Sequence, residues 1–386
     1  MKIGIIGSGT AGLLTVSSLL SSIKNADIYL LYDPNIDIIG VGESTLLGFP
    51  NNLYNSIGFN VDQHFHNLRC TFKHQVTFTN WKKEDFYSRF PAGNYGIHFN
   101  NRELRQFLLP IFSKEYPKRF FVKHGNVSKF TSKDSHVEVI LDNDVYVFDY
   151  LIDCRGFSEN YDDACFVDNI YVNSAIVCSS KKPGNWQFTY HYAHQYGWMF
   201  GIPLMDKQNW GYLYDNRFIS KEEALDNMKD IFKNPRNVDN VVSYPDIDFD
   251  KHMDYTFKSF YRKKLITENK NIIKNGNSLF FFEPLQATSM ECFEIVNDLI
   301  VSYIEGYGNK NEINNSYLSL MEEVIHFINY HYQNGSVYDS YYWKSCKEKS
   351  KNFIENHNLT KIINSGKSPW RFVDEKLSQY LRKELA

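Results

Sequence analysis

The sequence predicts an α/β fold in which a Rossmann-like parallel sheet is joined by an additional β-sheet and a C-terminal helical part. Three observations predict it. An apolar strand at residues 3–6 runs into a glycine-rich turn and a helix-like apolar segment. Strand patterns recur between residues 70 and 215. Apolar residues at helical spacing then dominate roughly the last 90 residues.

The glycine-rich turn reads Gly7-x-Gly9-x-x-Gly12. Gly7 permits the tight turn from strand to helix, Gly9 lets the backbone approach a pyrophosphate, and Gly12 lets the helix lie close to the strand. Thr10 and Ala11 begin the helix, whose first N–H groups lack partners within the helix and favour an anion. The turn therefore has the features of a phosphate-binding loop.

A second strand at residues 28–32 ends at Asp33. This carboxylate lies about 20 residues past the last glycine, where it can accept a hydrogen bond from a ribose hydroxyl. An ordinary glycine turn in an α/β protein is the alternative interpretation. Dinucleotide binding is favoured because the strand, the glycine turn, the helix, the second strand and the acidic residue follow one another at the expected spacing.

The remaining elements are predicted from periodicity and turn residues. We expect an amphipathic segment to about residue 57, strands over 70–97, a helix over 101–115, a β-meander over 119–153 and aromatic-rich strands over 165–215. From residue 221 the pattern favours mostly helices, with a polar break near 262–278. The segment ending at Asp153 is typical of a strand that returns to a parallel sheet, which predicts interleaved domains.

Composition excludes several classes of protein. The chain has 42 basic and 45 acidic side chains, so no strong field favours nucleic acid or an anionic membrane. No apolar run approaches the roughly 20 residues that span a bilayer. Since the nucleotide-binding strand begins at Lys2, we expect no signal peptide and a cytoplasmic protein. Six scattered cysteines without a C-x-x-C pair favour reduced thiols.

Several histidines suggest a metal site at first sight, but none has an acidic partner at ligand spacing, so we predict no metal. They are His64, His66, His74, His98, His191 and His194. His98 is expected to help build the dinucleotide pocket or simply to pack in the core.

Four further segments follow the glycine turn in a specific order. They are Gly-Val-Gly-Glu-Ser-Thr at 40–45, Phe-Lys at 72–73 with Phe-Thr-Asn-Trp at 78–81, Gly-Trp-Met-Phe-Gly-Ile-Pro at 197–203, and Phe-Glu-Pro-Leu-Gln-Ala-Thr-Ser-Met at 282–290. In this combination the chain resembles the flavin-dependent tryptophan halogenases. The third segment is similar to that family's W-x-W-x-I-P signature, and the fourth to its E-P-L-E-S-T loop. Residues 325–332 and 341–343 are similar to its helix near the aromatic pocket.

The resemblance implies an enzyme that uses reduced FAD, O2 and a halide (chloride, bromide or iodide) to form HOX. HOX would pass through a tunnel to Lys73 and halogenate an electron-rich aromatic substrate of indole or phenol type. Trp198 and Phe200, which point to the same side of one strand, would wall the tunnel. A separate flavin reductase would supply the reduced FAD, and a homodimer is possible on base rates.

The sequence departs from the family in the loop at 283–290. The family's glutamate is matched by Gln286 and the following serine by Ala287. A glutamine cannot accept the ring proton at neutral pH, but it can accept a hydrogen bond from the lysine. Glu283 and Glu291 are nearby candidates for the missing carboxylate. Thr288 and Ser289 match the halide-binding backbone positions.

The resemblance also implies a set of FAD contacts. They are Gly7, Gly9, Thr10, Ala11, Gly12, Asp33, Gly42, Glu43, Ser44, Thr45, Val127, Asn277 and Met290. We accordingly expect an FAD-binding module with an interleaved β-sheet substrate region over residues 1–300. A helical subdomain that covers the substrate is expected over 301–386.

Two other functions remain open from the sequence. The first is a flavoprotein monooxygenase that hydroxylates an aromatic ring, in which Lys73, Trp198 and Phe200 would have no role. The second is a degenerate FAD-binding protein without turnover, which the changes at Gln286 and Ala287 suggest.

Overall fold

The first sheet of the protein is parallel and has five strands. The computed structural model describes residues 1–38, 43–157, 160–233, 246–357, 368–373 and 375–385. The sheet order is β20-β12-β1-β2-β8, all neighbours being parallel. The strands are β1 (Lys2–Ile6), β2 (Asp27–Tyr32), β8 (Phe120–His124), β12 (Tyr150–Asp153) and β20 (Ile272–Lys274). The predicted α/β class with a Rossmann-like sheet is confirmed.

The two faces of this sheet are covered differently. On one face α1 (Thr10–Ser22) packs against β1 and β2, and α2 (Gly48–Ile57), α3 (Asn101–Glu115) and α5 (Thr288–Ile304) pack around α1. Residues 11–20 of α1 are all buried, and the polar Thr15, Ser17 and Ser18 among them make hydrogen bonds. The other face packs against an antiparallel sheet formed by β9 (Val127–Ser132), β10 (Val137–Leu141) and β11 (Asp144–Phe148).

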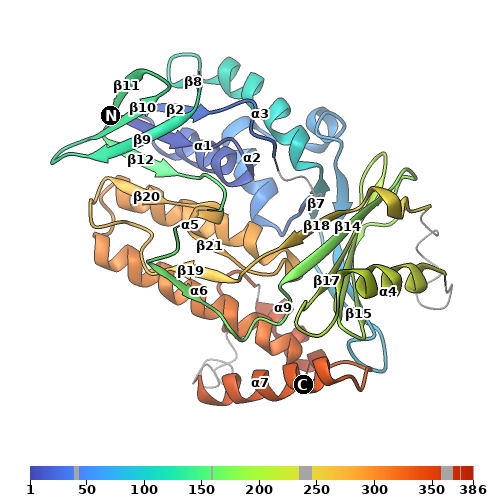
Figure 1. The fold of residues 1–386 in the computed structure, drawn as a ribbon. Helices are drawn as coiled ribbons and strands as arrows, with labels where there is room; N and C mark the ends of the chain where they lie inside the picture. The colour runs from blue at the N-terminus through green and yellow to red at the C-terminus, as the bar shows by residue number, and fades with distance from the viewer. Residues whose placement is uncertain (39–42, 158–159, 234–245, 358–367, 374, 386) are drawn as a thin grey trace.

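The second large sheet has seven strands and is mainly antiparallel. Its order is β18-β14-β17-β16-β15-β5-β6, with one parallel pair, β15 and β5. The strands are β5 (Gln75–Thr79), β6 (Phe86–Arg89), β14 (Ser174–Ser180), β15 (Phe188–His194), β16 (Gly197–Pro203), β17 (Gln208–Tyr214) and β18 (Met253–Thr256). In Figure 1 this sheet lies at the right, and the parallel sheet lies at the upper left.

The residues of β16 alternate between two cores. Met199 packs with the buried aromatic residues that α4 (Lys221–Lys233) covers. Trp198, Phe200 and Ile202 instead join the main core, which also contains residues of α5 and α6 (Lys310–Tyr332). The inner face of the sheet therefore holds both aromatic residues of the third motif, as the period of a strand predicts.

Two small antiparallel sheets complete the strands. One has the order β3-β7-β4 and the other β13-β19-β21. Their strands are β3 (Glu43–Ser44), β4 (Thr71–Lys73), β7 (Gly96–Phe99), β13 (Ala164–Phe166), β19 (Phe260–Arg262) and β21 (Phe280–Phe281). Only His74 separates β4 from β5, so the first small sheet runs directly into the seven-stranded sheet.

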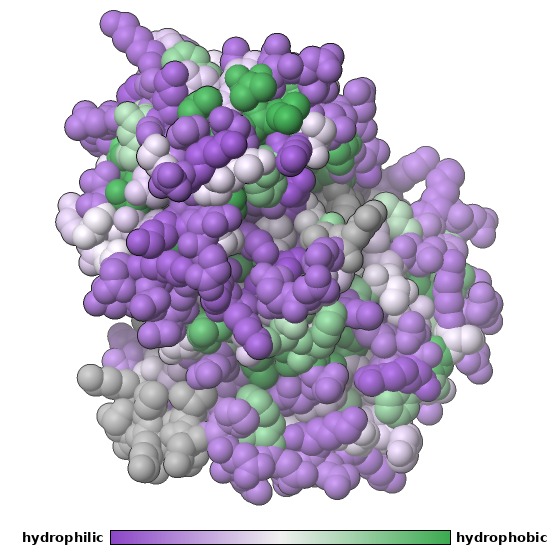
Figure 2. Space-filling model, turned by 60° about the vertical axis from the view of Figure 1, so that its left-hand side comes forward, coloured by the Kyte–Doolittle hydropathy of each residue, from purple (hydrophilic) through white to green (hydrophobic). Residues whose placement is uncertain are grey.

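The C-terminal part contains α6, α7 (Tyr341–Asn356) and α9 (Glu375–Leu385). Short helical turns are η1 (Val61–Phe65), η2 (Phe249–Lys251), η3 (Gly276–Ser278) and η4 (Leu285–Ala287). No helix within the described ranges is long and apolar enough to cross a bilayer. Hydrophilic side chains cover most of the face shown in Figure 2, with small scattered apolar groups.

Most predicted elements are confirmed, including the helix over 101–115 and the strands over 70–97 and 165–215. Two predictions were wrong. The meander over 119–153 comprises only β9–β11, because β8 joins the parallel sheet, whereas β12 joins that sheet as predicted for the segment ending at Asp153. The region after residue 221 is not mostly helical up to 282, since it contains β18–β21, with β20 inside the polar break.

The interleaving of the chain is seen in the parallel sheet, whose outer strand β20 follows the seven-stranded sheet in sequence. The division into 1–300 and 301–386 stays a prediction, and residue 300 lies within α5.

Candidate active site

The glycine turn between β1 and α1 has the backbone geometry that its sequence predicts. Gly7 has a φ of +105°, which L side chains rarely adopt. A Cβ on Gly12 would lie 2.0 Å from the carbonyl oxygen of Gly7, so the helix approaches the turn too closely for any side chain. A Cβ on Gly9 would meet nothing within 4 Å. The space beside Gly9 is therefore open to a ligand.

No acidic side chain in the first turn of α1 offsets the positive end of the helix dipole. Its N-cap residue, Gly9, makes no side-chain capping bond, and the first turn contains no acidic residue. Arg105 of α3 donates to Ser8 Oγ at 3.2 Å and so places a guanidinium beside the turn. Free N–H groups, the positive end of the helix dipole and a nearby cation fit a pyrophosphate. The sequence reasoning missed Arg105, because no motif marks it.

Other predicted cofactor residues gather at the carboxyl edge of the parallel sheet. Asp33 follows β2, and Val127 lies just after β8, whose following Gly125 donates its N–H to Tyr32 at 3.0 Å. Asn277 lies in η3 after β20, where a Cβ on Gly276 would come within 2.7 Å of Ala11 Cβ. Parallel sheets bind nucleotides at this edge, so these positions fit a dinucleotide.

Three more predicted cofactor residues lie on or beside β3. Glu43 accepts a hydrogen bond from Asn101 Nδ2 at 3.0 Å, and burial raises its pKa to about 7. The hydroxyl of Thr45 is bonded to the N–H of Ile97, and that of Ser44 to two side chains described below. The N–H of Thr45 also donates to the carbonyl of Ile97 at 3.0 Å, so both ends of this hydrogen-bonded pair hold β3 against β7. Gly42 lies outside the described residues.

Lys73 ends β4 and is completely buried. Its amine donates to Ser44 Oγ at 2.9 Å and lies 5.6 Å from the centre of the Phe90 ring. Burial lowers the pKa of Lys73 to about 7, although the charge of Glu291 opposes this effect. The neutral amine is therefore accessible near pH 7, and this form can act as a nucleophile as well as a hydrogen-bond donor.

The hydrogen bond from Lys73 belongs to a series of side-chain hydrogen bonds in which every donor can be assigned. Thr71 Oγ1 donates to the carbonyl of Pro203 at 2.6 Å, so it accepts from His98 Nδ1 at 3.2 Å. Nε2 of the neutral His98 then accepts from Thr189 Oγ1 at 2.9 Å.

Thr189 in turn accepts from Ser44 Oγ at 2.7 Å, and Ser44 accepts from Lys73. In this series of hydrogen bonds, each donation therefore runs in the direction from Lys73 to His98. His98 packs in the core beside this chain, and burial together with the charge of Lys73 keeps its pKa well below the usual value.

The loop that carries Gln286 is bent by two left-handed residues. Gln286 has a φ of 55° and Ala287 a φ of 62°. Such conformations are unfavourable for non-glycine residues and concentrate at functional sites. Ala287 is the N-cap of α5 and makes no side-chain capping bond, and Ser289 lies in the first turn of the helix. The N–H of Thr288 donates to the carbonyl of Leu285. Met290 is buried in the first turn of the same helix.

Gln286 is held by two histidines. Its backbone N–H donates to His191 Nε2 at 3.2 Å, and its side-chain Nε2 lies 2.7 Å from His331 Nε2. Burial lowers the pKa of His331 to about 4 and that of His191 well below its usual value. The charge of Lys73 also lowers the pKa of His191, which places the lysine near this pair. Sequence reasoning assigned no role to either histidine.

Aromatic rings pack around the two histidines that hold Gln286. Trp198 stacks on His191 with ring centres 5.0 Å apart, and its ring centre lies 6.4 Å from those of Phe200 and Trp81. Trp81 in turn contacts Trp343 and Tyr332 at 5.4 and 5.5 Å. Residues from β16, α6 and α7 therefore meet, as the sequence motifs predicted.

Glu283 and Glu291, the candidate carboxyl groups, lie on opposite ends of the motif. Glu283 accepts a hydrogen bond from Tyr332 at 3.0 Å, and burial raises its pKa to about 8 despite this bond. Glu291 accepts from the N–H of Gly48 at 3.2 Å, and burial raises its pKa to about 7. Both are therefore largely or partly protonated at pH 7.

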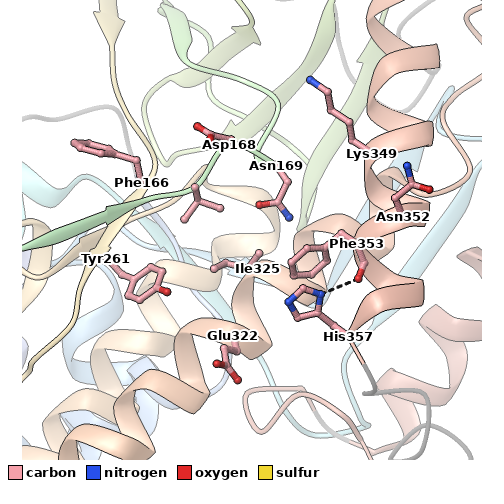
Figure 3. A pocket seen from close by; sticks show the side chains of 11 residues that line it. Phe166, Asp168, Asn169, Tyr261, Glu322, Ile325, Lys349, Asn352, Phe353 and His357 are labelled. Atoms are coloured by element: carbon pink, nitrogen blue, oxygen red, sulfur yellow. Dashed lines mark hydrogen bonds between the residues drawn. The ribbon is translucent and has the colours of Figure 1, made fainter.

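An open pocket of about 600 Å³ lies elsewhere, between α6, α7 and the segment after β13. Figure 3 shows its lining, with Phe166 and Asn169 opposite Lys349, Phe353 and His357. None of the predicted site residues lines this pocket. Within the described ranges no three His, Cys, Asp or Glu residues are arranged to hold a metal.

Comparison with known proteins identifies relatives of the chain. The family model described as tryptophan halogenase matches residues 2–120 and 92–380. The tryptophan 7-halogenase RebH of Lentzea aerocolonigenes is 20% identical, with 90% of this chain and 79% of that protein covered.

Solved structures share the fold. The tryptophan 6-halogenase SttH of Streptomyces toxytricini superposes with a TM-score of 0.82 at 19% identity, covering 99% of this chain and 89% of that one. BrvH, a flavin-dependent halogenase from Brevundimonas sp. BAL3, gives 0.80 at 19% identity, covering 100% and 89%.

Proposed function

The chain belongs to the tryptophan halogenase family, and we propose that it halogenates an electron-rich aromatic substrate with reduced FAD, O2 and halide. One observation carries this proposal: a primary amine, Lys73, is buried and partly neutral beside a strained loop and an aromatic wall. Burying an amine costs free energy, so a buried lysine with a strongly lowered pKa indicates a functional site. A hydroxylating enzyme would have no use for it.

The glycine turn, the uncapped start of α1 and Arg105 would hold the pyrophosphate of FAD. Asp33 would accept the ribose hydroxyl, with Val127, Asn277 and the backbone of β3 beside the rest of the cofactor. Bound reduced FAD would supply the activation of O2 that oxidises the halide. A separate flavin reductase would provide the reduced form.

The N–H of Ser289 would bind the halide, together with the N–H of Thr288, which the halide would share with the carbonyl of Leu285. Both N–H groups lie at the start of α5, where the dipole favours an anion and no side chain caps the helix. The left-handed Gln286 and Ala287 before them turn the chain into the helix start.

Lys73 would deliver the electrophile that arrives as HOX through a tunnel. In its neutral form the amine attacks the halogen, an N–X bond forms and the X–O bond breaks. The departing hydroxide takes one amine proton and leaves as water. The ring carbon then attacks the halogen, the N–X electron pair returns to nitrogen, and the amine regains a proton as the ring loses one. Trp198 and Phe200 would separate this compartment from the cofactor.

The presence of Gln286 favours phenol-type over indole-type substrates. A neutral amide cannot take the ring proton, and a phenol hydroxyl assists attack from within the substrate itself. A homodimer stays a prediction.

The test is mass spectrometry of an aromatic panel incubated with reductase, FAD and bromide, with Lys73→Ala in parallel. We expect brominated products from the native protein and none from the variant, with FAD affinity retained. Hydroxylated products without bromination would favour the monooxygenase alternative. Tight FAD binding with no product of either kind would favour a flavin-binding protein without turnover.

A further inference from the structure

His331 meets Gln286 through a hydrogen bond whose direction can be worked out. The imidazole is buried on α6. Its Nδ1 lies 2.8 Å from the carbonyl oxygen of Phe327, one helical turn earlier, and its Nε2 lies 2.7 Å from Gln286 Nε2. Phe78, Trp81 and Phe327 surround the ring.

A carbonyl oxygen only accepts hydrogen bonds, so Nδ1 of His331 must carry a proton. Burial lowers the pKa of His331 to about 4, so the ring is neutral near pH 7 and Nε2 holds a lone pair. The atom of Gln286 that meets this lone pair must therefore be the amide nitrogen, which donates. The carbonyl oxygen Oε1 must point elsewhere.

We infer that His331 is a positioning residue that fixes the Gln286 amide so that Oε1 is the atom offered to the reactants. His191 holds the backbone of the same residue, so both ends of Gln286 are fixed. With Nε2 used by His331, Oε1 is the end of the amide that would accept from the Lys73 ammonium or from HOX. The inference rests on the proposed function, and deepens it by giving Gln286 one oriented acceptor in place of a carboxylate.

This arrangement predicts what happens when the family's glutamate is restored. In Gln286→Glu a carboxylate oxygen would face the lone pair of His331, and two acceptors at 2.7 Å repel each other. The site relieves this by protonating His331, which then forms an ion pair with the introduced carboxylate. Among the described residues, the titratable group that interacts with His331 is His191 on β15, and its low pKa leaves it neutral. The single variant would therefore lack a free carboxylate.

The experiment is ¹⁵N NMR of ring-labelled histidines in the protein without flavin. In the native protein we expect His331 to be neutral, protonated on Nδ1 from pH 6 to 8. In the Gln286→Glu variant we expect it to be doubly protonated at pH 7. A histidine with Nε2 protonated in the native protein, at the His331 position, would overturn the inference.

His326, on the same helix, is the internal control. Its Nδ1 accepts from Trp370 Nε1 at 3.1 Å, so its neutral form carries the proton on Nε2, opposite to His331. Its resonances should not change in Gln286→Glu. A His331→Gln spectrum identifies the His331 signals by their loss.

Turnover provides the second readout. His331→Met leaves the amide free to rotate, and we expect kcat to fall about 10-fold with an unchanged substrate KM. His331→Gln retains an acceptor near the position of Nε2 and should recover most of the loss. Equal losses in both variants would mean a purely structural role. If the native protein forms no halogenated product, the proposed function fails, while the NMR result still decides the orientation.

Discussion

The glycine turn and the cluster around Lys73 are built in opposite ways. The turn uses one short segment, in which Gly7, Gly9 and Gly12 act through the absence of side chains. The cluster uses side chains from distant segments, among them Lys73 on β4, Thr189 on β15 and His331 on α6. A site made from backbone is encoded locally, whereas a site made from buried side chains exists only after folding.

The cluster also differs from the turn in its electrostatics. Burial shifts each of its ionisable groups towards the neutral form, lowering the pKa of Lys73 and His331 and raising that of Glu283. Such shifts destabilise the folded protein, and their concentration around one amine indicates a site maintained for chemistry. The glycine turn acts through backbone N–H groups and involves no such destabilising pKa shift.

The largest expected effect separates chemistry from stability at Lys73. Lys73→Met should abolish halogenated product, a loss of about 1,000-fold or more, because no other amine is placed to receive the electrophile among the described residues of the cluster. The same variant should also be more stable, because a buried charge is removed. We expect its free energy of unfolding at pH 7 to be higher by roughly 1–4 kcal/mol and its melting temperature to rise.

The pH dependence of the unfolding free energy tests whether Lys73 is buried. The folded pKa of Lys73, about 7, lies below the ordinary value of 10.5, so between these values the unfolded chain binds more protons. Stability from this group therefore rises with pH across that window in the native protein, and Lys73→Met should lose the rise. Thermal unfolding at pH 7 and pH 9.5 measures it. A variant that is less stable at both values would contradict the buried position.

The glycine turn provides the next largest effect and a matched pair. Gly9→Ala adds a methyl to open space and should leave stability unchanged while weakening FAD binding about 10-fold or more. Gly12→Ala places a methyl against the Gly7 carbonyl and should lower stability by about 2 kcal/mol or more. Fluorescence titration with FAD and thermal unfolding separate the two. If Gly9→Ala binds FAD as the native protein does, the cofactor does not approach this backbone.

The two regions also show what the sequence can and cannot predict. Gly7, Asp33 and the helix over 101–115 follow from local patterns, and the structure confirms the turn and helix. Strand β20 was missed because only three residues, in a polar segment, form it through pairing with β12. His331 and His191 were also missed, since their roles depend on Gln286, far away in the sequence.

A smaller effect tests the hydrogen-bond chain that leaves Lys73. Thr189→Val keeps the shape but removes the hydroxyl that links Ser44 to His98. We expect about a 10-fold loss in kcat, because Ser44 can then turn and the amine loses a fixed acceptor. Thr189→Ser retains the hydroxyl and should keep most activity. Similar kinetics for the valine and serine variants would show that the chain does not assist Lys73.

The smallest effect concerns Glu283, and it decides whether this carboxyl replaces the one absent at Gln286. Its raised pKa of about 8 keeps it protonated at pH 7, where Gln is its isostere and can still accept from Tyr332. Glu283→Gln should therefore change kcat by no more than about twofold.

The contribution of Glu283 to the stability of the native protein should fall as pH rises from about 4.5 to about 8, because the folded carboxyl retains a proton that the unfolded chain has released. Glu283→Gln should lack this loss and be the more stable protein at pH 8. A drop in kcat of about 10-fold or more at pH 7, with stability preserved, would instead assign proton transfer to Glu283. The missing carboxylate would then lie three residues before its expected place in the loop.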